Sequence, residues 1–149
     1  MLIMITKVHP TKLILMGNIA APGYWVDFIS ATISGQAIFV PANADEQLSG
    51  QSYYVETNYE AIRDYQIMTE EKVSSVSIKP LSNPGDYEVV AEVKFVLLTN
   101  NEINNPLVYV EVGEARFALT TNELGEQVPN VGDVVSFKLK ELSLWDENI

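Results

Sequence analysis

The chain has 149 residues, enough for one domain with a well-buried core or for two small barrels. It contains no cysteine and a single histidine, which excludes disulfide scaffolds, thiolate catalysis and cysteine-ligated zinc or iron–sulfur sites, and is typical of a cytoplasmic protein. Twenty acidic side chains against nine basic ones give a net charge of −11, which opposes binding to a nucleic-acid backbone or an anionic membrane and favours a cationic partner.

The first half of the chain predicts short strands. Residues 1–5 are apolar but too few for a membrane span, and no basic residues precede them as in a signal peptide, so we expect a strand there. Weaker alternation predicts further strands at 12–19, 25–34, 36–40 and 52–59. The segment 58–71 has two interpretations, a bent strand or a short helix capped by Asn58.

The second half predicts its strands more sharply. Residues 71–86 are rich in proline, glycine and serine, which indicates a linker or an edge strand. The segment 87–99 then alternates so well that every second side chain, through Phe95 and Leu97, is expected on one face. Residues 107–112 and 115–119 follow as a hairpin around a two-residue turn.

The last strand starts after Val131-Gly-Asp133 and changes phase near its end. Val135, Phe137 and Leu139 share one face, but beyond Lys140-Glu141 the apolar positions become Leu142 and Leu144. A slip of one residue predicts a bulge or a bend, the usual means of turning a barrel corner.

The sequence also contains an internal repeat. The second half reads Gly113-Glu-Ala-Arg-Phe117, Glu126-Gln127, Gly132-Asp-Val-Val-Ser-Phe137 and Asp146, and the first half Gly35-Gln-Ala-Ile-Phe39, Glu46-Gln47, Gly50-Gln-Ser-Tyr-Tyr-Val55 and Asp64. Small gaps are needed to align them, so duplication and coincidence between two similar β-meanders both stay open. Under duplication, Phe39 and Phe117 are expected at corresponding core positions.

These patterns predict an all-β protein made of two tandem or intertwined OB-like small β-barrels with at most one short helix. The expected division places the first barrel in residues 1–70, a linker or edge strand in 71–86, and the second barrel in 87–149.

Part of the second half resembles a known family. Val108-Tyr-Val-Glu-Val-Gly113, Phe117-Ala-Leu119, Val131–Phe137 and Glu141-Leu-Ser-Leu-Trp-Asp146 are similar to the small OB-type barrel of the TOBE or molybdate-binding-like group, which includes the C-terminal regulatory domain of maltose-type ABC transporter ATPases. The resemblance implies a regulatory or small-oxyanion-binding barrel. The chain departs from the family in having no P-loop, and in having Thr11-Lys-Leu-Ile-Leu15 where the free-standing molybdate binders carry a polar signature.

The sequence predicts no catalytic residue, no metal site and no cofactor. His9 stands alone beside a proline and is expected in a surface loop, and no serine lies in a nucleophile-elbow pattern. The adjacent acids at 45–46, 70–71 and 146–147 would face opposite ways in strands or water in turns, which does not suit a carboxylate pair for catalysis.

Aromatic and acidic side chains are the remaining candidates for a binding surface. Tyr24 and Trp25 are neighbours in one predicted strand and Tyr53 and Tyr54 in another, so one ring of each pair must face away from the core. Such rings either bind a partner or cover an interface between the two barrels or between two copies. The candidate partner-binding residues are Tyr24, Trp25, Tyr54, Asp133, Trp145, Asp146 and Glu147.

We therefore expect a non-catalytic binding protein that engages a basic protein partner through an acidic, aromatic-containing barrel face, as an inhibitor, an immunity-like protein or a regulatory module. One alternative is an OB-fold protein that binds single-stranded nucleic acid, which the net charge disfavours. Another is a small-oxyanion binder of the molybdate type. The acids also have a simpler role, in keeping a β-protein soluble and shielding its edges, and a homodimer is compatible with the exposed edges.

Overall fold

The computed structural model describes residues 1–15, 21–43, 47–68, 75–97, 107–125 and 127–148. The strands are β1 (Leu2–Leu15), β2 (Ala21–Ser30), β3 (Gly35–Val40), β4 (Ser52–Asn58), β5 (Ala61–Ile67), β6 (Ser77–Pro80), β7 (Tyr87–Leu97), β8 (Leu107–Val112), β9 (Ala115–Leu119), β10 (Val134–Lys140) and β11 (Ser143–Asp146). Among the described residues α1 (Thr121–Leu124) is the only helix, and no helix there has the length and apolar character to cross a membrane. The prediction of an all-β, barrel-like fold with at most one short helix is confirmed.

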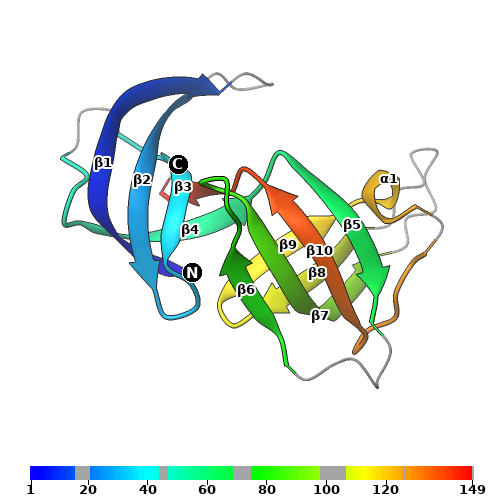
Figure 1. Cartoon of the computed structure of the whole chain (residues 1–149). Helices are drawn as coiled ribbons and strands as arrows, with labels where there is room; N and C mark the ends of the chain where they lie inside the picture. Colours follow the sequence, from blue (N-terminus) through cyan, green and yellow to red (C-terminus); the bar gives the residue numbers. More distant parts are fainter. Residues whose placement is uncertain (16–20, 44–46, 69–74, 98–106, 126, 149) are drawn as a thin grey trace.

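The strands form two sheets that lie side by side (Figure 1). Five of them close a barrel in the order β1-β2-β3-β11-β4, in which β11 runs parallel to β3 and antiparallel to β4. The other six form a second, antiparallel sheet in the order β5-β10-β7-β8-β9, with β6 paired to β7. One continuous apolar core serves both sheets.

The two halves of the chain use the same pairing scheme, and each places its fifth strand in the other sheet. In the first half β1 pairs with β2 and β4, and β2 with β3; in the second half β7 pairs with β8 and β10, and β8 with β9. The fifth strand of the first half, β5, pairs with β10, whereas the fifth strand of the second half, β11, pairs with β4. The fold therefore consists of two similar units that exchange their last strands.

The register of the pairs supports this equivalence. Tyr54 lies opposite Leu2 as Ser136 lies opposite Val90. From the second strand onward, equivalent positions differ by 82 residue numbers, as 54 and 136 do. Equivalent positions in the first strands of the two halves, β1 and β7, differ by 88, as 2 and 90 do. The offset is larger there because the β1–β2 hairpin is longer than the β7–β8 hairpin.

Three hydrogen bonds before the fourth strand recur in both halves. The Gly50 N–H donates to the Ile5 carbonyl at 2.8 Å, and the Gly132 N–H donates to the Val93 carbonyl at 2.9 Å. Ile5 and Val93 in turn donate to the residues that follow these glycines, at 2.9 and 2.8 Å, and those residues donate back to Leu48 and Asn130 at 3.1 and 3.0 Å. Both glycines have positive φ, 82° and 94°, which only glycine adopts without strain. These turns correspond, as the repeated Gly50 and Gly132 landmarks predict.

Asp64 and Asp146 also correspond, since they differ by 82, but the Gly-x-Ala-x-Phe landmarks are out of register. Phe39 and Phe117 are both buried, but Phe117 lies opposite Val110, and this pair corresponds to Gly35 opposite Phe28. In the first half the phenylalanine of the pair is on β2, and in the second half it is on β9, the equivalent of β3. One ring therefore fills similar space in both halves. The prediction that Phe39 and Phe117 occupy corresponding positions is wrong by four residues, since Phe117 minus 82 is residue 35.

The expected boundary between 1–70 and 87–149 does not separate the two sheets. The exchange places residues 143–146 in the closed barrel and residues 61–67 in the second sheet. The open question at 58–71 resolves as a strand over Ala61–Ile67, bent where Asp64 has a φ of 55°; residues 69–71 lie outside the described residues. The phase change near 140–141 is a crossing from one sheet to the other, and Glu141 there has a φ of 58°.

The expected alternation of 87–99 fails at its end. A register shift between Val93 and Phe95 marks a bulge at Lys94, so the side chains beyond it turn to the other face. Phe95 and Leu97 are therefore 52% and 40% exposed, whereas Tyr87 through Val93 keep the predicted alternation. The first half has a register shift at the same point, between Ile5 and Lys7.

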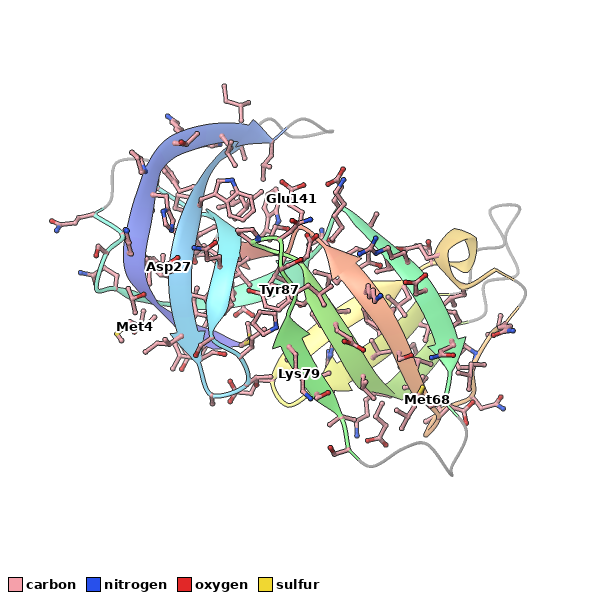
Figure 2. The ribbon with its side chains drawn as sticks, in the orientation of Figure 1. Met4, Asp27, Met68, Lys79, Tyr87 and Glu141 are labelled. Carbon is pink, nitrogen blue, oxygen red and sulfur yellow. The ribbon has the colours of Figure 1, made fainter. Side chains whose placement is uncertain are left out.

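Tyr87 joins the two sheets. Its ring is buried on β7, and its hydroxyl donates to the Gln36 carbonyl of β3 at 2.6 Å (Figure 2). Burial raises the pKa of this phenol to about 12. Gly35 makes room for the ring, because a Cβ there would lie 2.4 Å from the hydroxyl oxygen.

Candidate functional site

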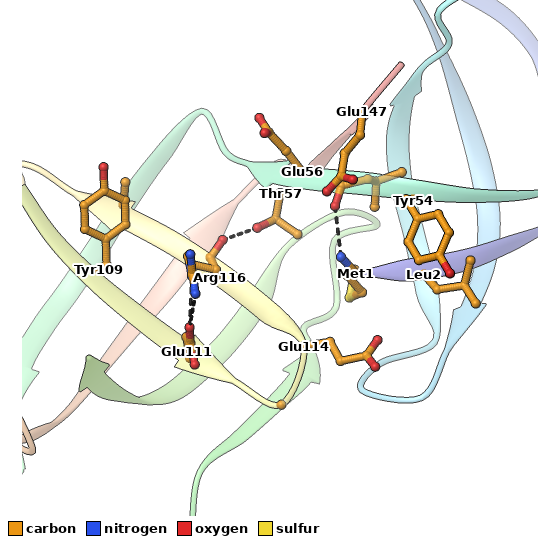
Figure 3. Close-up of a pocket in the computed structure, with 13 residues that line it drawn as sticks. Met1, Leu2, Tyr54, Glu56, Thr57, Tyr109, Glu111, Glu114, Arg116 and Glu147 are labelled. Carbon is orange, nitrogen blue, oxygen red and sulfur yellow. Dashed lines mark hydrogen bonds and ion pairs between the residues drawn. The ribbon is translucent and has the colours of Figure 1, made fainter. Parts of the chain in front are cut away.

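A cleft of about 900 Å³ opens where the barrel meets the second sheet (Figure 3). One wall consists of the start of β1, the outer face of β4 and Glu147, which follows β11; the other is the β8–β9 hairpin. The residues that line it include Leu2, Tyr54, Glu56, Glu111, Glu114, Arg116 and Glu147.

Strand alternation points these side chains into the cleft. Val55 is buried, so its neighbours Tyr54 and Glu56 face outward from β4. On the opposite wall Glu111 pairs across the hairpin with Arg116. The Glu147 N–H donates to the Tyr54 carbonyl at 2.9 Å, which fixes the last acid beside the tyrosine.

Three links hold the two walls in place. The Thr57 hydroxyl donates to the Arg116 carbonyl, and the Tyr59 hydroxyl donates to the Ala118 carbonyl at 2.6 Å. At the hairpin tip the Glu114 N–H donates to the Thr32 hydroxyl at 3.0 Å. Burial, followed by the charge of Glu123, raises the pKa of Tyr59, so its hydroxyl remains a donor.

The cleft is acidic because four carboxylates line it against two cationic groups, the Arg116 guanidinium and the Met1 amine. The Arg116 guanidinium donates to one Glu111 carboxylate oxygen through both Nε and Nη2, at 2.9 and 2.6 Å. The Met1 amine donates to the Val55 carbonyl at 3.1 Å. In the described part of the chain no ion pair reaches Glu56, Glu114 or Glu147. Three carboxylates thus face the cleft without a cationic partner.

The structure brings only Tyr54 and Glu147 of the predicted site residues into this cleft. Tyr54 is 63% exposed, while its neighbour Tyr53 packs on Phe39 with ring centroids 4.7 Å apart. Trp145 is half-buried and donates to the Ser143 hydroxyl at 3.2 Å. Asp133 accepts from the Asn130 N–H at 2.9 Å within its own turn, on the second sheet.

Burial of Asp146 and packing of Tyr24 and Trp25 within the protein engage three of the predicted partner-binding residues. Asp146 is buried and accepts from the N–H groups of Ala42 and Asn148, at 3.3 and 3.1 Å, so it is a structural residue. Tyr24 packs against the core. Trp25 lies beside the loop before β7, where a Cβ on Gly85 would come within 2.8 Å of its ring. Trp25 therefore covers the contact between the sheets, one of its two predicted roles.

Sequence reasoning missed Glu56, Glu111, Glu114 and Arg116. Each lies at an exposed or partly exposed strand position or turn, where charged side chains usually serve only solubility. His9, expected in a loop, lies in β1, where its Nε2 is 2.8 Å from Asp27 Oδ1 and lowers the pKa of that carboxyl.

Over the described residues no group of three or more histidine, aspartate or glutamate side chains is placed to hold a metal ion. Comparison of the chain with protein-family models, with curated proteins and with solved structures yields no match.

Proposed function

We propose that this chain is a non-catalytic binding protein and that the cleft between β4 and the β8–β9 hairpin takes a basic segment of a protein partner. The observation that carries the proposal is the set of three cleft carboxylates, Glu56, Glu114 and Glu147, which form no ion pair with any residue that the structure describes. Lysine or arginine side chains of a partner would supply the missing positive charge. The net charge of −11 on the whole chain would attract them from a distance. We place this activity in the cytoplasm, where a cysteine-free composition fits.

Nucleic acid is the less favoured ligand. The strand order of the closed barrel is that of an OB-type barrel, whose β2–β3 face is the usual site for oligonucleotides. In this chain that face holds Trp25, which packs beside Gly85, and Ile38, which is only 2% exposed. The ring that would stack on bases is thus occupied by a contact within the protein.

The test uses a fluorescein-labelled peptide in which lysine alternates with serine, so that an extended peptide presents its lysines along one side. Fluorescence anisotropy should show binding at low salt that weakens as the Debye length falls to about 8 Å at physiological ionic strength. The Glu56→Gln/Glu147→Gln variant should bind less tightly, mainly through a slower on-rate.

The matched control is Glu88→Gln/Glu92→Gln, which removes the same charge from β7 outside the cleft. This control should retain most of the binding. Equal losses in the two variants would show that net charge alone attracts the peptide and would overturn the proposal. Tight binding of a labelled single-stranded DNA at physiological salt would overturn it in favour of the nucleic-acid alternative.

A further inference from the structure

Four apolar or aromatic side chains form an exposed surface on the barrel next to the cleft. Met4 lies opposite Ile29 on β2, and Leu2 lies opposite Tyr54 on β4. Directly opposite side chains on neighbouring strands are in contact, so the four make one surface across β2, β1 and β4, which we call the apolar patch. Their exposed fractions run from 36% for Met4 to 63% for Tyr54. Figure 2 shows Met4 pointing away from the barrel.

The second half of the chain shows that the fold does not need apolar residues at these positions. Glu92 and Glu111 stand where the first half has Met4 and Ile29. At the positions of Leu2 and Tyr54 the second half has Val90 and Ser136. The same strand pairing therefore forms with charged or polar side chains at three of the four positions, Val90 being the exception. Strand pairing alone does not account for the apolar patch, and exposed apolar surface of this kind usually marks an interaction site.

The apolar patch is continuous with the acidic cleft. Leu2 and Tyr54 belong to both, and Glu56 follows Tyr54 by two residues on the same face of β4. Glu147 is fixed beside Tyr54 by its backbone hydrogen bond. Past the end of the apolar patch that lies away from the cleft, Lys7 is opposite Asp27, so positive and negative charge are matched there. The uncompensated charge next to the apolar patch is therefore negative.

This charge decides between the candidate occupants. A second copy of the chain, docked symmetrically on the same surface, would bring the acids beside Tyr54 of both copies close together. An anionic lipid surface is repelled for the same reason. A basic protein segment that carries an apolar side chain is complementary to both parts.

We infer that the apolar patch anchors an apolar side chain of the same segment whose basic side chains enter the cleft. This inference rests on the proposed function and adds a requirement to it: the partner segment is extended and places an apolar or aromatic residue beside its basic residues. Burial of one such side chain against Met4 and Ile29 should tighten binding roughly tenfold.

The experiment compares the lysine–serine peptide with the same peptide carrying one terminal phenylalanine. The protein is tested as the wild type, as Met4→Thr/Ile29→Thr, which replaces the two patch residues that do not line the cleft, and as Ile14→Thr. Ile14 is the matched control, because it is 68% exposed on β1 and lies outside the apolar patch and the cleft. Threonine is chosen because it is polar and has the β-branched shape that strands favour.

The phenylalanine peptide should bind the wild type and Ile14→Thr roughly tenfold more tightly than the lysine–serine peptide, and this gain should vanish in Met4→Thr/Ile29→Thr. Equal affinities of the two peptides for the wild type, or a gain that survives in the double variant, would overturn the inference and leave the proposed function standing. If neither peptide binds at low salt, the proposed function itself fails. Sedimentation of the wild type as a dimer that Met4→Thr/Ile29→Thr converts to a monomer would assign the apolar patch to a second copy instead.

Discussion

Replacing Tyr87 by phenylalanine tests the joint that holds the barrel and the second sheet together. The hydroxyl is lost while the ring stays, so the Gln36 carbonyl loses the donor that now lies 2.6 Å away. The loss of one neutral, largely buried hydrogen bond should lower the free energy of unfolding by about 1–2 kcal/mol near neutral pH. Urea denaturation at constant m-value measures this difference.

The pH dependence makes this prediction sharper. The folded protein raises the pKa of Tyr87 from its ordinary value of 10 to about 12, so it favours the neutral phenol. The associated stability is fully present below pH 10 and is lost as the pH rises through 12. By pH 12 the wild type should have lost about 2 kcal/mol through this group, a loss that the phenylalanine variant cannot show.

Plotted against pH, the unfolding free energies of the wild type and of Tyr87→Phe should therefore approach each other and cross between pH 10 and 12. The variant should be less stable than the wild type below the crossing and equally or more stable above it. The other buried tyrosines titrate in both proteins and do not affect the difference. A difference in unfolding free energy that stays constant from pH 8 to 12 would refute the reasoning, because it would mean that the Tyr87 phenol is not desolvated in the folded state.

Three further outcomes follow from the same contacts. Asp146→Asn should cost roughly 1–3 kcal/mol of stability in urea and leave lysine-peptide binding unchanged, because its carboxylate caps backbone N–H groups inside the barrel. Arg116→Ala should tighten lysine-peptide binding and steepen its salt dependence, since it frees the Glu111 carboxylate; weaker binding would contradict the account of the cleft. Gly35→Ala should destabilise the wild type more than it destabilises the Tyr87→Phe variant, because the added Cβ meets the Tyr87 hydroxyl oxygen; equal costs in a double-mutant cycle would exclude that clash.

The alternation of apolar and polar residues predicted the strands well where one face of the strand meets the core and the other meets solvent. The hairpin 107–119 begins and ends as expected, because alternation and a two-residue glycine turn fix both register and length. The bulge at Lys94 escaped prediction because Phe95 and Leu97 continue the apolar alternation even though they face solvent. Apolar side chains on an outer face carry no local sign of their exposure.

The exchange of the fifth strands could not be predicted from residue alternation, for a different reason. Alternation in 61–67 and 143–146 shows which side chains face a core, but both sheets contribute to one core, so either sheet satisfies the pattern. The same limit applies to the cleft. Tyr54 stood out as the outward member of an aromatic pair. Glu56 and Glu111 are ordinary strand acids in the sequence, and only the fold brings β4 and the β8–β9 hairpin face to face.

The strand exchange itself creates the cleft. The chain leaves β4 at Asn58 and runs beside β9 on its way into the second sheet, which places the Thr57 and Tyr59 hydroxyls on β9 carbonyls. If β5 paired within its own half, the chain would not pass β9 after Asn58, and the Thr57 and Tyr59 hydroxyls would not hold β4 beside β9. The equivalent crossing, from β10 into β11, runs beside β3, where the Ile38 N–H donates to the Leu142 carbonyl and the Leu142 N–H to that of Gly85. The Gly85 loop and Trp25 lie at that second crossing, so the two halves share a scheme of pairing but differ in the side chains at the crossing.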